Sequence, residues 1–79
     1  MLTLKIVSPE KIVYNGPCER VKVPGTLGSF EVLDNHAPII SSLETGVVEY
    51  VTEAGTESLK IDGGFVSVRK NEVNLCVEV

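Results

Sequence analysis

Residues 66–79 read VSVRKNEVNLCVEV, and apolar side chains occupy every second position on both sides of Asn71-Glu72. Successive side chains of a β-strand point to opposite faces, so this spacing predicts two strands that each bury one face. Asn71-Glu72 is typical of the turn that would join them. The residues expected to face the core are Val66, Val68, Val73, Leu75, Val77 and Val79.

The beginning of the chain shows the same alternation, with Leu2, Leu4 and Ile6 on one face of a predicted strand. Ser8-Pro9-Glu10 ends that strand, because proline lacks the N–H that strand pairing would use. Residues 11–23 predict two short strands or one bent strand, interrupted at Asn15-Gly16-Pro17. Asn15-Gly16 would supply the positive φ that a tight turn or a bulge requires.

The middle of the chain contains further short apolar stretches separated by turn residues. Residues 24–29 are predicted to form a loop, residues 30–33 a brief strand, and Asp34-Asn35 the turn that ends it. The whole chain gives roughly eight short strands and no segment with helical period, which is typical of a β-sandwich or barrel. We therefore predict a single all-β domain over residues 1–79.

Composition and charge exclude several classes of protein. The net charge is -4, with 11 acidic against 7 basic residues, whereas phosphate binding needs an excess of Lys and Arg, so no nucleic-acid partner is expected. Cys18 and Cys76 match neither a metal-ligand spacing nor a disulfide framework and are expected to be small buried or half-buried residues. No apolar run approaches the ~20 residues of a membrane span, and no signal peptide is apparent. We expect a soluble chain that reaches a membrane only through a protein partner.

No set of residues predicts catalysis or cofactor binding. His36 is the one histidine, and although Asp34 is close in sequence, no nucleophile motif surrounds the serines. One histidine and two distant cysteines do not make a zinc site. Gly25-Thr26-Leu27-Gly28 lacks the Gly-Lys-Ser/Thr ending of a phosphate loop. The prediction is a chain with no catalytic residue, cofactor, metal or small-molecule substrate.

Lys22 leaves one alternative open. Small all-β carrier domains present a modified lysine on a hairpin, and Lys22 lies between Val21 and Val23. No acidic or small-residue turn flanks it, so a solvated strand lysine is the preferred interpretation. A small all-β binding or carrier module is therefore kept as the alternative function.

Several motifs together resemble the epsilon subunit of F-type ATP synthases, over essentially the whole chain. The most specific combination is His-Ala-Pro followed at a distance by Gly-Gly-Phe. The resemblance implies a flattened two-sheet sandwich of about ten strands. The matching motifs are Ser8-Pro9-Glu10, Gly25-x-x-Gly28-x-Phe30-x-Val32-Leu33, His36-Ala37-Pro38-Ile39-Ile40, Gly63-Gly64-Phe65-x-x-Val68 and Asn71-x-Val73.

The resemblance also implies a function, a location and contact residues. The function is that of a non-catalytic central-stalk subunit that couples the gamma shaft to the membrane c-ring during proton-driven ATP synthesis. The location is peripheral, on the cytoplasmic face of the bacterial inner membrane. Structural turns are implied at Gly25, Gly28, Gly63 and Gly64. The polar loops of the c-ring would be contacted by Pro24, Gly25, Thr26, Leu27, Gly28 and Ser29, and gamma by His36, Ala37, Pro38, Ile39, Ile40 and Ser41.

Three departures from the family pattern qualify these implications. Asp34-Asn35 replaces the usual Pro-Gly, and the turn is expected to survive because Asn tolerates positive φ. Leu27 and Ser29 stand where many relatives carry acidic residues, so Leu27 is predicted to be an apolar anchor. The sequence ends at Val79, before the helical hairpin of the family, so it is either a naturally short form or an excised domain. The regulatory role of that hairpin is not implied.

Overall fold

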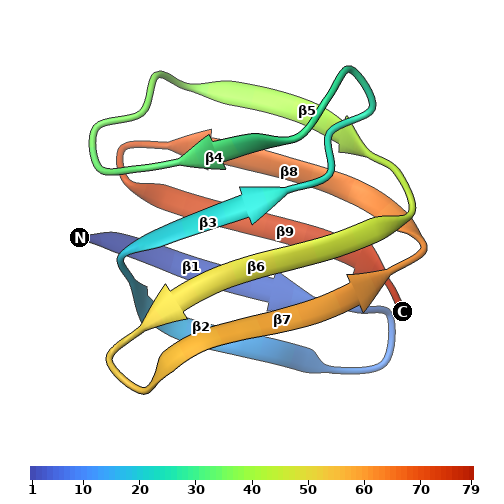
Figure 1. The fold of residues 1–79 in the computed structure, drawn as a ribbon, viewed down its shortest axis with the longest axis horizontal. Helices are drawn as coiled ribbons and strands as arrows, with labels where there is room; N and C mark the ends of the chain where they lie inside the picture. The colour runs from blue at the N-terminus through green and yellow to red at the C-terminus, as the bar shows by residue number, and fades with distance from the viewer.

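The computed structural model describes residues 1–79 as nine strands arranged in two facing sheets, with no helix (Figure 1). The all-β sandwich expected from the sequence is confirmed, and nine strands lie within the expected eight to ten. In the absence of any helix, none is available to cross a membrane. The strands are β1 (Leu2–Val7), β2 (Ile12–Cys18), β3 (Arg20–Val23), β4 (Phe30–Val32), β5 (Ile39–Leu43), β6 (Gly46–Thr52), β7 (Gly55–Ile61), β8 (Gly63–Arg69) and β9 (Glu72–Glu78).

The five-stranded sheet has the order β2-β1-β9-β8-β5, and the four-stranded sheet has the order β4-β3-β6-β7. All pairs are antiparallel except β1 with β9, which run parallel and join the two ends of the chain. The molecule is flattened, with extents of 27 × 25 × 18 Å. Strands β4 and β5 are edge strands of different sheets and lie on the same side of the sandwich (Figure 1).

The core lies between the sheets and follows the alternation of the sequence. Leu2, Leu4 and Ile6 of β1 face inward, and the intervening residues face solvent. The prediction for β8 and β9 is confirmed except at Val79, which is exposed beyond the end of β9. Since interdigitating apolar layers are the main stabilising element of a sandwich, this pattern accounts for the fold. The core residues are Leu2, Leu4, Ile6, Cys18, Val21, Val23, Val32, Leu43, Val48, Tyr50, Ile61, Val66, Val68, Val73, Leu75 and Val77.

The predicted interruption at Asn15-Gly16-Pro17 is wrong, because these residues lie inside β2 and pair continuously with β1. The bend instead falls at Glu19, between β2 and β3. Strand β2 is an edge strand, where a proline is tolerated because one side of its backbone needs no partner. Gly16 leaves room for the Tyr14 ring, whose hydroxyl donates a hydrogen bond to the Pro17 carbonyl at 2.6 Å.

Gly63 and Gly64 are the first two residues of β8 rather than the turn before it, which is formed by Asp62. Both have positive φ, 152° and 146°. A Cβ on Gly64 would collide with the Cys76 carbonyl oxygen and lie 2.9 Å from the Val77 Cα on strand β9. The second glycine therefore permits two backbones to approach more closely than any other residue would allow.

The turn at Asp34-Asn35 survives the absence of Pro-Gly, as the sequence predicts. Asn35 has a φ of 64°, in the left-handed region that asparagine tolerates. Its backbone N–H donates a hydrogen bond to the Asn71 side-chain oxygen at 2.7 Å, which ties this turn to the turn between β8 and β9.

We expect Asn35→Gly to leave stability unchanged to within about 0.5 kcal/mol, because glycine adopts the same φ without strain. Asn35→Val should lower the free energy of unfolding by about 1–2 kcal/mol, since a β-branched side chain is disfavoured in the left-handed region. Urea titrations of the two variants and the parent chain measure the difference. Equal stability of the valine and glycine variants would contradict this account.

Cys18 is a buried thiol in the core, and its Sγ donates a hydrogen bond to the Arg20 carbonyl at 3.4 Å. Burial raises the pKa of the Cys18 thiol above its ordinary value of 9.0. Burial likewise raises the pKa of the Tyr50 hydroxyl above 10.0, with Glu57 adding to the rise. The neutral form of each group is therefore favoured in the folded state.

An acidic group whose pKa is higher in the folded than in the unfolded state contributes to stability. This contribution is complete below the unfolded pKa and is lost as the pH rises through the folded pKa. We expect the free energy of unfolding to be level at about pH 7–8 and to fall above about pH 9. The free energy of unfolding of Cys18→Ala should fall less steeply over the same pH range, and the slope that remains should come from Tyr50. Urea titrations at several alkaline pH values measure both slopes, and identical slopes would exclude Cys18 as a cause.

Candidate functional site

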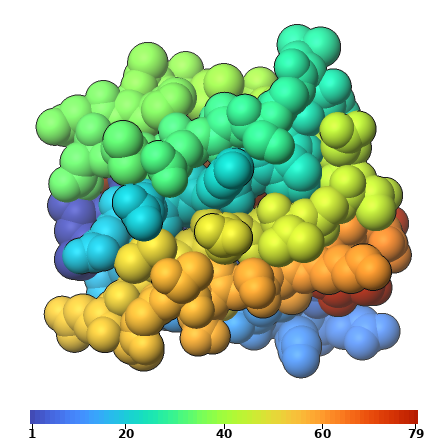
Figure 2. All heavy atoms as spheres, viewed as in Figure 1, coloured from blue at the N-terminus to red at the C-terminus, as the bar shows by residue number.

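The loop of residues 24–29 joins β3 to β4 and divides into a buried and an exposed part. Pro24 and Gly25 are buried, whereas the four residues from Thr26 to Ser29 are exposed. Leu27 has 103% of its reference area accessible, the largest exposure among the large apolar residues. The loop forms the projection at the upper right of the molecule (Figure 2). Of the residues predicted to contact the c-ring, Thr26, Leu27 and Ser29 can therefore offer side chains to a partner.

Backbone hydrogen bonds hold this loop against β5. Thr26 N–H donates to the Ser42 carbonyl at 3.1 Å, and Glu44 N–H donates to the Pro24 carbonyl at 2.9 Å. Gly28 N–H donates to the Gly25 carbonyl at 2.9 Å and closes the loop on itself. A Cβ on Gly46 would lie 2.9 Å from the Pro24 Cβ, so the proline ring packs directly on that glycine. The loop is thus fixed to the five-stranded sheet although it begins in the four-stranded one.

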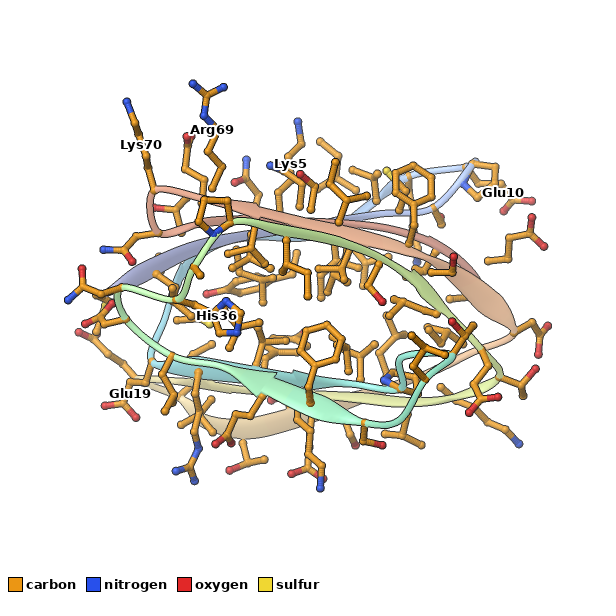
Figure 3. All side chains as sticks on the ribbon, turned by 90° about the horizontal axis from the view of Figure 1, so that it is seen from above. Lys5, Glu10, Glu19, His36, Arg69 and Lys70 are labelled. Carbon is orange, nitrogen blue, oxygen red and sulfur yellow. The ribbon has the colours of Figure 1, made fainter.

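The residues predicted to contact gamma, 36–41, enter β5 with alternating orientation. Ile39 and Ser41 are half-buried and point toward the interior, whereas Ile40 points outward with 81% of its area exposed. The His36 ring lies between the two sheets at their open side (Figure 3), with its centroid 6.5 Å from that of Phe30. Its Nδ1 lies 2.6 Å from the Ala37 carbonyl oxygen.

Two shallow hollows lie on either side of β5. The inner hollow, about 380 Å³, is lined by Leu27, Gly28, Ser29, Phe30, His36, Ile39 and Ser41. The outer hollow, about 430 Å³, is lined by Pro38, Ile39, Ile40, Ser67, Val68 and Arg69. The inner hollow brings together residues from both predicted contact regions. The two regions therefore form one continuous surface, which we call the β4–β5 edge and define as residues 24–30 and 36–42.

Arg69 and the exposed Phe65 were not among the contact residues expected from the sequence. Phe65 is 51% exposed on the outer face of the five-stranded sheet, because it alternates with the buried Val66. Arg69 and Lys70 project from the same face (Figure 3). The two ion pairs of the chain lie elsewhere, between the Met1 amine and Asp34 and between Arg20 and Glu31. Phe65 and Arg69 alternate with the apolar residues Val66 and Val68, so the two-residue period of β8 would have predicted that both are exposed.

The residues weighed for metal binding, catalysis or lysine modification lie on different elements of the fold. No group of three or more His, Cys, Asp or Glu side chains is placed to hold a metal ion. His36 contacts a backbone carbonyl and lies near an aromatic ring, and no hydrogen bond joins it to a serine. Lys22, the basis of the carrier alternative, lies in the middle of β3, opposite Glu31 on one side and Glu49 on the other. A lysine flanked by two strands is not on a hairpin tip.

Comparison with protein families gives a match over the entire chain. Residues 1–79 match the family described as the ATP synthase delta/epsilon chain β-sandwich domain. The chain is 38% identical over 77 residues to the ATP synthase epsilon chain of a Synechococcus species, covering 98% of this chain and 56% of that one. It is 42% identical over 76 residues to the epsilon chain of Desulfitobacterium hafniense, covering 96% and 58%. The chain therefore spans less than two thirds of the length of these relatives.

Solved structures share the fold. A chain of the Euglena gracilis mitochondrial ATP synthase superposes with a TM-score of 0.89 at 22% identity, covering 96% of this chain and 49% of that one. A chain of the Tetrahymena thermophila mitochondrial ATP synthase superposes with a TM-score of 0.83 at 15% identity, covering 99% and 63%. At these identities the likeness concerns the sandwich architecture.

Proposed function

The chain belongs to the family of ATP synthase delta/epsilon chain β-sandwich domains, and on that premise we propose that it is a non-catalytic rotor module that joins the gamma shaft to the membrane c-ring. Residues 36–41 contact gamma in this proposal, and residues 26–29 contact the polar loops of the c-ring. The module sits peripherally at the cytoplasmic face of the bacterial inner membrane.

The observation that carries the proposal is the attachment of the loop to β5. A coupling element must transmit force between two partners without deforming, and a flexible loop would absorb it. Here Thr26 and Pro24 are hydrogen-bonded to Ser42 and Glu44, at the end of the same strand that presents Ile40. A load applied at the tip of the loop would pass through these bonds into the five-stranded sheet and reach the gamma contact directly.

The body behind this edge supports the same role. Sixteen apolar residues form a single core between the two sheets, and no buried side-chain polar atom lacks a hydrogen-bond partner. Close-packed interiors have low compressibility and transmit strain. In the proposed mechanism, proton flow turns the c-ring, and the sandwich keeps ring and shaft rotating together so that torque reaches the catalytic head. No proton passes through this chain.

The proposal is tested by using the chain as bait against detergent-solubilised membranes of its host, with bound proteins identified by mass spectrometry. We expect recovery of gamma and c subunits. Binding of purified gamma is measured separately by isothermal titration, so that the two contacts are resolved. Absence of both subunits under gentle conditions would overturn the proposed function.

Leu27 is the test of the c-ring contact. We expect Leu27→Asp to weaken recovery of the c subunit about tenfold, because an apolar anchor that fills a partner site contributes about 1–3 kcal/mol. Recovery of gamma should change less than recovery of the c subunit, since Leu27 is fully exposed at the tip of the loop and is one of seven residues that line the inner hollow. The measurement is quantitative mass spectrometry of the bound proteins.

A matched control is Ala54→Asp, which places the same charge on the exposed turn between β6 and β7, away from the β4–β5 edge. Ala54→Asp should leave both recoveries unchanged. Normal assembly of Leu27→Asp with the ring would show that Leu27 is not an anchor.

A further inference from the structure

Strand β5 is the least protected edge of the sandwich. The other three edge strands carry features that oppose pairing with another chain: Pro17 in β2, Glu31 in the three-residue β4, and Glu57 with Lys60 in β7. Natural sheets use charges, prolines and short strands in this way. The sequence of β5 is Ile-Ile-Ser-Ser-Leu, with neither a charge nor a proline.

Only the second half of β5 is covered. The Ser42 carbonyl accepts a hydrogen bond from Thr26 and therefore points away from the sheet. Backbone groups alternate along a strand, so the N–H and C=O of Ile40, two residues earlier, point to the same open side. The bridge between Gly25 and Leu43 ends the coverage before it reaches Ile40. The first half of β5 thus presents backbone donors and acceptors to solvent.

Side-chain space is available on both faces of this free half. A strand added beside β5 would direct alternate side chains toward the inner and the outer hollow. The inner hollow is largely apolar, with Phe30, Ile39 and Leu27 among its lining residues. The outer hollow ends at Arg69, which forms no ion pair, although Glu72 stands opposite it in the ladder. An apolar residue followed by an acidic one would complement the two hollows.

We propose that the free half of β5 accepts an extended strand of the gamma shaft, which extends the five-stranded sheet across the subunit boundary. The strand pairs with the backbone of Ile40, places an apolar side chain in the inner hollow, and places a neighbouring acidic side chain toward Arg69. Main-chain hydrogen bonds give such an interaction its affinity, and the alternating pockets give it specificity. This inference rests on the proposed gamma contact and states its geometry.

The first experiment measures amide hydrogen exchange of the isotopically labelled chain by NMR, alone and with purified gamma. We expect the Ile40 amide to exchange at least about tenfold more slowly in the complex, because it gains a hydrogen bond. The Ser41 amide is the internal reference, since alternation directs it toward β8 in both states.

The second experiment compares Ile40→Pro with Ile40→Ala by isothermal titration against gamma. Both lose the isoleucine side chain, and only the proline lacks the N–H. Proline is compatible with the fold at this position because the Ile40 N–H is not used by β8. We expect Ile40→Pro to bind about tenfold more weakly than Ile40→Ala, and matched circular dichroism spectra verify that both are folded.

The outcomes separate the two proposals. Binding of gamma with an unprotected Ile40 amide, and with equal affinity of the two variants, overturns strand addition and leaves the gamma contact standing. If the Ile40 amide becomes protected without gamma as the concentration of the chain is raised, a second copy of the chain occupies the edge. That result also overturns strand addition by gamma. Failure of the parent chain to bind gamma overturns both proposals together.

Discussion

Gly64→Ala is expected to remove a large part of the folding stability of this chain. The new Cβ would collide with the Cys76 carbonyl and the Val77 Cα, both backbone atoms of the neighbouring strand, so no side-chain rotation relieves the clash. Separating β8 from β9 would open the centre of the five-stranded sheet. Steric overlap costs about 1–3 kcal/mol, and a non-glycine residue at a φ of 146° costs about 1–3 kcal/mol more.

Together these costs come to about 2–6 kcal/mol, a large part of the stability of a small domain at roughly 0.05–0.15 kcal/mol per residue. Thermal unfolding followed by circular dichroism measures the effect. Gly63→Ala is the matched control, because Gly63 has nearly the same φ, and its Cβ would meet nothing closer than the Leu43 carbonyl oxygen at 3.7 Å. That variant should lose about 1–2 kcal/mol. If the two variants unfold at the same temperature, the cost at this site comes from backbone conformation and not from the clash.

The second large effect is expected for Ile40→Asp, in binding to gamma. Ile40 is 81% exposed within the proposed contact and lines the outer hollow of the β4–β5 edge. An aspartate there would replace the apolar side chain by a charge that loses its water at the interface. Central anchors of this kind contribute about 2–4 kcal/mol, so the affinity for gamma should fall by about 30-fold or more. Isothermal titration with purified gamma measures the change.

Val47→Asp is the control for this substitution. Val47 is an apolar residue with 50% exposure on the outer face of the four-stranded sheet, so the same charge is added to the opposite side of the molecule. Both variants should keep the thermal stability of the parent to within about 0.5 kcal/mol, because neither side chain belongs to the core. Equal binding of the two variants would remove residues 36–41 from the gamma contact.

Local alternation determined much of the fold from sequence alone. The inward positions of β1, β8 and β9 follow from the two-residue period, since a strand with one buried face leaves little choice of phase. The turn at Asp34-Asn35 was predictable for a similar reason, because the capacity of Asn35 for positive φ is intrinsic to the residue. The same logic failed at Asn15-Gly16-Pro17, where pairing with β1 prevails over local turn propensity.

What the tertiary structure alone decided is which distant segments meet. The parallel pairing of residues 3–7 with residues 72–76 carries no local signal, and neither does the attachment of Thr26 to Ser42. The family resemblance implied contacts of residues 24–29 and 36–41 with two partners, and the fold joins both stretches in one edge with a shared hollow. Backbone hydrogen bonds between remote strands depend on the arrangement of the whole chain rather than on the residues that make them. For that reason the sequence determined the strands and their faces, and the fold determined the surface they build.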